Sequence, residues 1–357
     1  MSTRDFLVEI GTEELPPKAL ASLSKAFTSE ILAGLKKLQL GFADSESFAT
    51  PRRLALLVSG LDESQADKAV ERFGPAVQAA FDADGNATPA ALGFAKSCNV
   101  AIDQLQRAEK DGVEKLFYSA SQPGQPTSAL LSAIVSEALD KLPIPKRMRW
   151  GNSRAEFVRP VHWVVQLFGD EVVAGQFFGV AAGKQSRGHR FHADKSIEID
   201  SPANYAALLE SEGHIIPQFE RRREMIRELV IAEGVKANAT SVIDEALLTE
   251  VASLVEFPVA LTGKFEAHYL EVPAEALILA MKSHQKTFYC VDDEGKLLPL
   301  FIAVSNIVSK DPAQVIEGNE RVIRPRLADA SFFFETDKQV SLESHLEELK
   351  KIVFQDK

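Results

Sequence analysis

One segment of the sequence places two arginines beside a tryptophan: Arg147, Arg149 and Trp150 lie close together. A guanidinium group binds backbone phosphate and an aromatic face stacks on an unpaired base, so this combination is typical of RNA contacts. The alternative is that Trp150 belongs to the core and the arginines are its solvated neighbours.

A second cationic segment lies further along the chain. Arg187, His189 and Arg190 surround the flexible Gly188, so one turn-like loop would present all three side chains. His189 and His192 could both bind a metal, but no third ligand follows at a suitable spacing, and we expect no metal. The segment predicts a second phosphate contact.

Two further groups of basic residues lie nearer the end of the sequence. His284 stands between two lysines at an expected helix end, where it would meet the negative end of the helix dipole or a phosphate. Arg324 and Arg326 flank Pro325, which fixes the backbone, so they would form a rigid fork for phosphate or for carboxylates of a partner. A solvated or salt-bridged surface is the alternative in both places.

Motifs that bind nucleotides or perform hydrolysis are missing from the sequence. Residues 179–186 come nearest to a phosphate-binding loop, but they are one residue short and have Gln185 where the magnesium-binding Ser or Thr belongs. No GxGxxG, GxSxG or HExxH pattern occurs. We therefore predict no catalytic residue and no cofactor in this chain.

Charge is distributed unevenly along the 357 residues. The net charge is −11, yet residues 141–190 contain nine Lys or Arg and three acids, a local +6. Such asymmetry is typical of a discrete RNA-facing surface on an acidic protein. Two cysteines are too few for a disulfide framework, and no signal peptide or membrane-spanning run is present, so we expect a cytoplasmic protein without membrane contact.

Hydrophobic periodicity predicts the elements that position these residues. Residues 6–10 and 54–58 alternate as strands do, and the pairs at 159–173 and 287–305 are expected hairpins. The expected helices cover residues 17–38, 129–142 and 273–283, and three more begin at Pro202, Pro217 and Thr240. This mixture predicts an α+β fold with mixed or antiparallel sheets.

The same reading divides the chain into four parts. Residues 1–60 open the α+β core, 61–140 form an inserted, mainly helical subdomain, 141–336 form an α+β module with a helical insertion at about 201–256, and 337–357 form a tail. The tail is expected to be a helix through Leu342, Leu346, Leu349 and Val353 to the last residue. A helix without a terminal cap predicts a truncated domain.

Several segments, taken in order, resemble the β subunit of the bacterial heterotetrameric glycyl-tRNA synthetase. They are Leu7 to Pro16, Ala49 to Leu54, Lys146 to Gly151, Phe157 to Trp163, Arg187 to Phe191, Met281 to Lys286 and Arg326 to Phe334. The resemblance spans the chain, which would be the N-terminal half of that subunit. It implies a part similar to the B3/B4-type module of the phenylalanyl-tRNA synthetase β subunit, followed by the start of an HD-type helical domain.

The resemblance also implies partners. In that family a separate α subunit handles glycine, ATP and magnesium, whereas the β subunit contributes tRNA binding and holds the α2β2 assembly together. The partners expected are the α subunit, glycine tRNA and a second β subunit. The candidate residues for contacts to tRNA or to a subunit are Arg52, Arg53, Lys146, Arg147, Arg149, Trp150, Arg187, His189, Arg190, His284, Arg324 and Arg326.

Three functions remain open at this point. The chain is an RNA-binding and subunit-binding part of a ligase, or an editing module that hydrolyses mischarged tRNA, or a scaffold whose arginines meet the α subunit. His189 and His284 are the polar residues that the editing hypothesis would use, although nothing in the sequence identifies a nucleophile.

Overall fold

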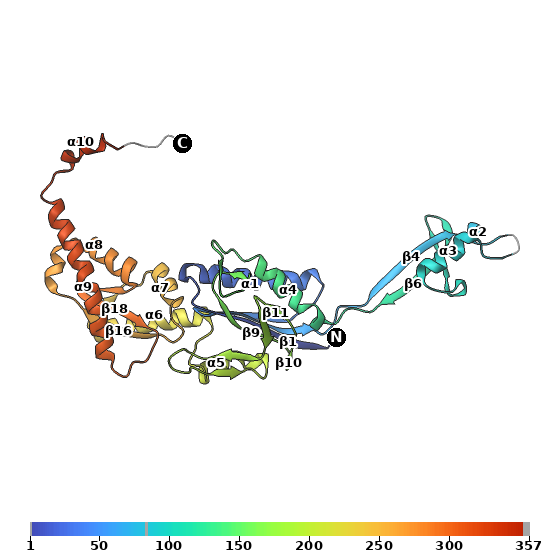
Figure 1. The fold of residues 1–357 in the computed structure, drawn as a ribbon, viewed down its shortest axis with the longest axis horizontal. Helices are drawn as coiled ribbons and strands as arrows, with labels where there is room; N and C mark the ends of the chain where they lie inside the picture. The colour runs from blue at the N-terminus through green and yellow to red at the C-terminus, as the bar shows by residue number, and fades with distance from the viewer. Residues whose placement is uncertain (1, 83–84, 353–357) are drawn as a thin grey trace.

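The computed structural model describes residues 2–82 and 85–352. Helices and mostly antiparallel sheets alternate along the chain, so the predicted α+β class is confirmed (Figure 1). No helix in these residues is both long and apolar enough to cross a bilayer.

The central sheet has seven strands in the order β11-β12-β9-β1-β3-β2, with β10 paired to β9. Its strands are β1 (Thr3–Thr12), β2 (Asp44–Thr50), β3 (Arg53–Asp62), β9 (Val161–Phe168), β10 (Glu171–Val172), β11 (Gln176–Phe177) and β12 (Val180–Gly183). All pairs are antiparallel except β12 with β9. The predicted strands at 6–10 and 54–58 and the hairpin β9-β10 are confirmed, and β2 was not predicted.

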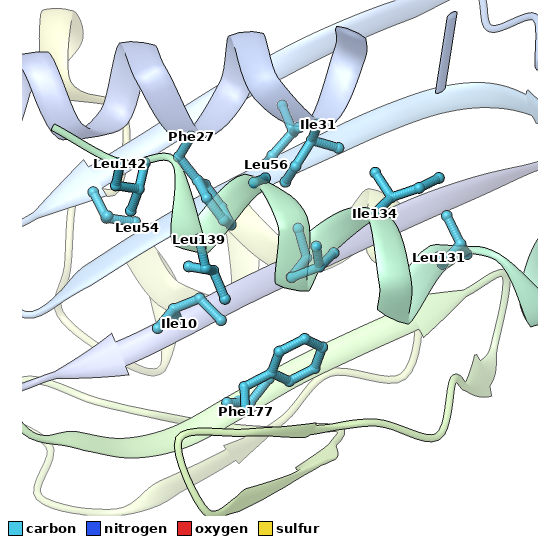
Figure 2. Packing of buried hydrophobic residues seen from close by; sticks show 14 of the residues in the cluster. Ile10, Phe27, Ile31, Leu54, Leu56, Leu131, Ile134, Leu139, Leu142 and Phe177 are labelled. Carbon is cyan, nitrogen blue, oxygen red and sulfur yellow. The ribbon is translucent and has the colours of Figure 1, made fainter. Parts of the chain in front are cut away.

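Two helices cover one face of this sheet. Helix α1 (Pro17–Lys37) begins at a proline, which suits the first helical position because that amide has no partner within the helix. Its apolar residues recur every three or four positions and are buried against the sheet and α4 (Leu131–Asp140). Figure 2 shows Phe27 and Ile31 of α1 with Ile134 and Leu139 of α4 in this core.

The opposite face carries a second core. A bend after β12 leads into β13 (Gln185–Arg187), which pairs with β14 (Ser196–Glu198), and α5 (Tyr205–Ser211) follows. Ile197 and Tyr205 pack here against Trp163 of β9. In Figure 1, α5 lies on the side of the sheet away from α1.

The C-terminal part has its own four-stranded sheet in the order β15-β17-β18-β16. Its elements are α6 (Phe219–Lys236), β15 (Thr240–Ser241), α7 (Glu245–Ala252), β16 (Val259–Lys264), α8 (Ala274–Leu279), a π-helix (Ala280–His284), β17 (Phe288–Val291), β18 (Leu297–Ser305) and α9 (Pro312–Asp337). The helix predicted to begin at Thr240 begins at Glu245, because Asp244 supplies the N-cap and Thr240–Ser241 pairs with β17. The hairpin β17-β18 is confirmed.

Residues 61–140, which were predicted to be a mainly helical subdomain, combine helices with a small sheet. They contain a three-stranded sheet of β4 (Lys68–Ala76), β6 (Val113–Gln122) and β5 (Gln106–Lys110), with the short helices α2 (Val77–Ala80) and α3 (Pro89–Cys98). Polar residues dominate these strands because the small sheet buries little apolar surface. The subdomain projects from the central sheet at the end opposite α9 (Figure 1).

The last part of the chain also differs from expectation. The predicted fork of Arg324 and Arg326 around Pro325 lies inside the continuous helix α9. After α9 come a 3-10 turn (Leu342–His345) and the one-turn helix α10 (Leu346–Leu349), where a longer helix was predicted. The end of that predicted helix, at residues 353–357, lies outside the described residues.

Candidate nucleic-acid interface

Arg159 and the second predicted cationic segment meet at the turn between β1 and α1. Arg159 Nε donates to the main-chain oxygen of Glu14 (2.9 Å), and Arg190 Nη2 lies 2.8 Å from Glu13 Oε2. His162 Nε2 lies 3.0 Å from the other oxygen of Glu13. Burial acts to raise the pKa of Glu13, but the hydrogen bond and charge of Arg190, with smaller effects of His162 and Arg52, outweigh it, so the pKa is lowered. This turn therefore brings two arginines and a histidine together.

The first segment reaches this turn through a small hairpin. Its strands are β7 (Met148–Arg149) and β8 (Glu156–Phe157). Arg149 is 68% exposed and pairs with Glu156, whereas Arg147 donates only to main-chain carbonyl groups. Arg159 lies 3.9 Å from the sulfur of Met148, so the hairpin and the turn form one continuous face.

Trp150 does not present an open ring to solvent. It is half-buried at the edge of the main core, with its ring centroid 6.4 Å from that of Phe178. The structure therefore favours the alternative interpretation, in which Trp150 belongs to the core and does not stack on a base. Lys146, in contrast, is exposed.

A second tryptophan supports the cationic face from below. Trp163 is 6% exposed and lies against Gly11, where an added Cβ would come within 1.9 Å of the ring. The guanidinium groups of Arg52 and Arg187 lie 5.6 and 5.7 Å from its ring centroid, within cation–π range. Its Nε1 donates to Glu9 Oε1 at 2.8 Å, which fixes the ring. Burial lowers the pKa of Arg52, but a guanidinium retains its charge at neutral pH.

We call this region the basic surface. It consists of Arg52, Arg147, Arg149, Arg159, His162, Arg187 and Arg190. Only the carboxylates of Glu13, Glu14 and Glu156 pair with it among the described residues. The arginines therefore outnumber the carboxylates on a chain whose net charge is −11.

Arg53, a predicted contact residue, lies beneath the basic surface and has no exposed area. Its Nη1 donates to Glu9 Oε1 and to Ser186 Oγ, both at 3.2 Å, and its Nε donates to Thr50 Oγ1 at 3.2 Å. Glu256 Oε1 lies 3.5 Å from Nη2. The predicted contact is therefore wrong for this conformation, because the guanidinium is enclosed in a buried ion network.

A second buried arginine extends this network into the C-terminal part. Arg222 of α6 donates to the carbonyl oxygens of Ile216 (2.6 Å), Ala49 (2.7 Å) and Ala252 (3.1 Å). Burial lowers its pKa to about 10, so the side chain remains charged at neutral pH. Arg222 thus joins α6 to the end of β2 in the central sheet.

His189 is also fully buried and cannot contact a partner directly. Its Nδ1 accepts from the amides of Phe191 (3.2 Å) and His192 (3.3 Å). The His192 ring stacks on it at 4.8 Å, and His192 Nε2 accepts from the amide of Val308 at 3.0 Å. The two histidines hold the loop between β13 and β14 in place and attach it to the segment before α9.

The attachment of this loop is expected to weaken in acid. Burial lowers the pKa of His192 below its ordinary 6.5, and the facing His189 and His214 lower it further. The folded chain therefore binds a proton at His192 less readily than the unfolded chain does. As a result, the free energy of unfolding decreases as the pH falls from 6.5 through the lowered pKa. Protonated Nε2 can no longer accept from Val308.

Amide hydrogen exchange at Val308, corrected for intrinsic exchange, measures this effect. Protection should fall below the ordinary pKa of His192, and His192→Gln, which does not titrate, should remove the pH dependence. Equal protection of Val308 at acid and neutral pH in the unchanged chain would contradict the expectation.

The remaining candidates lie on other elements. His284 is exposed in the π-helix, and Arg324 of α9 pairs with Glu266 at 2.6 Å. Arg326 is exposed on the same helix. None of the three contributes to the basic surface as defined. In the described ranges, no group of three or more His, Cys, Asp or Glu is placed to hold a metal ion.

Sequence reasoning missed three residues of this region as contact candidates. Arg159 and His162 were assigned to a strand hairpin, and only their shared contact with the Glu13 turn reveals their role. Phe191 was noted only within a motif, yet it is 73% exposed. The local sequence contains no signal for its exposure.

Comparison with known proteins assigns the chain to a family. A family model described as glycyl-tRNA synthetase beta subunit matches residues 6–357. The glycine-tRNA ligase beta subunit of Hahella chejuensis is 56% identical over 99% of this chain and 51% of its own length. Those of Marinobacter nauticus and Psychromonas ingrahamii are 53% and 50% identical over 100% of this chain and 52% of theirs.

These relatives are subunits of aminoacyl-tRNA synthetases, and the matches therefore define this class of protein. The chain belongs to the family of glycyl-tRNA synthetase beta subunits, and the predicted resemblance is confirmed. The chain spans about half the length of the curated relatives it matches.

Proposed function

We propose that this chain supplies a tRNA-binding surface and a subunit contact to a cytoplasmic glycine-tRNA ligase of α2β2 composition. Glycine, ATP and magnesium would be handled by the α subunit. The observation that carries the RNA contact is that Arg159 and Arg190 meet at Glu13 and Glu14. Segments far apart in sequence contribute to one positive face there.

The electrostatics support an oriented encounter with RNA. Phosphate groups are attracted to the basic surface and repelled by the acidic remainder of the chain, so one face is favoured. Arg187 is exposed and has no carboxylate partner among the described contacts, which leaves its charge available. Phosphate contacts of this kind position RNA without reading its sequence.

Reversing two of these charges tests the proposal. The variant Arg159→Glu/Arg187→Glu is expected to weaken glycine tRNA binding about 10- to 30-fold, because each exposed contact is worth about 0.5–1 kcal/mol and reversal adds repulsion. Fluorescence anisotropy with labelled tRNA measures the affinity. Arg321→Glu on α9, which is 74% exposed, is the matched control and should bind normally. Unchanged affinity of the double variant would remove the basic surface as the RNA site.

A second candidate function is assembly with another subunit. Phe332 and Phe333 of α9 are 65% and 61% exposed, and such paired aromatic rings favour contact with a protein. The α subunit or a second β subunit would cover them.

The editing hypothesis and the likeness to a B3/B4-type module stay predictions. The two histidines proposed for editing lie apart in the fold, since His189 is buried beneath the basic surface and His284 lies in the π-helix. Neither is within hydrogen-bonding reach of a nucleophile in the contacts described.

A further inference from the structure

Phe191 is an aromatic side chain that the protein holds in solvent. It is 73% exposed, at the tip of the loop between β13 and β14. Both tryptophans, in contrast, are engaged in packing, Trp163 beneath arginines and Trp150 against Phe178. Phe191 is therefore the aromatic face that this region leaves available.

The loop that bears Phe191 is rigidly built. Its backbone is closed by the amide of Gly188 bonded to Lys195 O (3.0 Å) and that of Ala193 bonded to His189 O (2.9 Å). The imidazole of His189 accepts from the Phe191 amide itself, which fixes the orientation of this residue. A rigid loop loses little conformational entropy on binding, so the contacts made by its tip contribute nearly all of their interaction free energy to affinity.

The surroundings of Phe191 indicate what it contacts. Arg190 precedes it directly, and Arg187 lies at the start of the same loop. Both belong to the basic surface, so a ligand attracted to this face carries negative charge. An exposed aromatic ring on a loop segment that also carries two arginines matches unpaired nucleotides, whose phosphates meet arginine while their bases stack.

We propose that Phe191 stacks on an unpaired base of the RNA whose phosphates contact the basic surface, an inference that rests on the proposed function. Every base has a π-face, so the contact would favour single-stranded over paired RNA without selecting a particular base. Phe191 would thus position the single-stranded part of the RNA.

Three substitutions at this position, made in the whole 357-residue chain, test the proposal. The probe is an RNA hairpin with a single-stranded 3′ extension that contains 2-aminopurine, and the reference is the same hairpin without the extension. Phe191→Ala should weaken binding of the extended hairpin about 5- to 150-fold and abolish quenching of 2-aminopurine. The salt slope should not change, because no phosphate contact is removed.

Phe191→Trp should retain affinity and quenching, whereas Phe191→Leu should lose both. Val235→Ala, which removes an apolar side chain that is 68% exposed on α6, is the control and should have no effect. Because these side chains are exposed, the variants should fold normally, and thermal unfolding checks this.

The outcomes separate the two proposals. If Phe191→Ala binds the extended hairpin normally while Arg159→Glu/Arg187→Glu weakens it, the stacking proposal fails and the RNA surface stands. If neither variant changes the affinity for the extended hairpin, both the stacking proposal and the proposed RNA surface fail. Full binding by Phe191→Leu without quenching would show an apolar contact in place of stacking and overturn the proposal.

Discussion

Replacing Arg53 by methionine is expected to lower the free energy of unfolding by about 3–5 kcal/mol, the loss typical of a broken buried ion pair. The substitution leaves the carboxylates of Glu9 and Glu256 buried without their cation. Urea unfolding followed by tryptophan fluorescence is a suitable measurement, because Trp163 bonds to Glu9 and reports on the network.

The control for this experiment is Arg149→Met, the same change at an arginine that is 68% exposed. Its effect should stay below about 1 kcal/mol, since exposed ion pairs contribute little. A second variant, Glu9→Gln in addition to Arg53→Met, should recover part of the loss because one unpaired charge is removed. An Arg53→Met chain as stable as the Arg149→Met chain would contradict the structural role of the network.

The second large effect is expected at Arg222, where methionine should cost at least about 3 kcal/mol because three buried carbonyl groups lose their donor. These carbonyls belong to Ala49, Ile216 and Ala252, so the contact between α6 and the central sheet should loosen. Limited proteolysis should then cut the connection at residues 211–218 faster.

The neighbouring Arg221 provides an internal comparison. It lies on the same helix but is 52% exposed and pairs with Glu210, so Arg221→Met should change stability by less than about 1 kcal/mol. If Arg221→Met and Arg222→Met lowered the free energy of unfolding equally, the loss would come from the change within helix α6 and not from the buried hydrogen-bond donor.

Local patterns were sufficient to predict much of the fold. Helix α1 was predictable because its apolar residues repeat with the helical period behind a proline, and β17-β18 because a turn signal separates two apolar runs. The three-stranded sheet of the insertion was harder to predict, because its strands are polar and lack alternation. Thr240-Ser241 resembles an N-cap, but pairing with β17 decides its structure.

The candidate site was harder to predict because its parts meet only in three dimensions. Sequence indicated that cations gather near Arg147 and Arg187, but not that Glu13 and Glu14 join them. It also did not separate the buried Arg53 from the half-buried Arg52 beside it, since the burial of each side chain depends on tertiary packing. The exposure of Phe191 depends on histidine contacts that no local pattern encodes.

The most direct test of the central claim is the salt dependence of glycine tRNA binding to this chain. If the basic surface contacts phosphates, the logarithm of the association constant should fall linearly with the logarithm of salt concentration, with about one unit of slope for each phosphate contact. The Arg159→Glu/Arg187→Glu chain should show a slope shallower by about two units. Binding that does not respond to salt, or a slope unchanged in the double variant, would contradict the account.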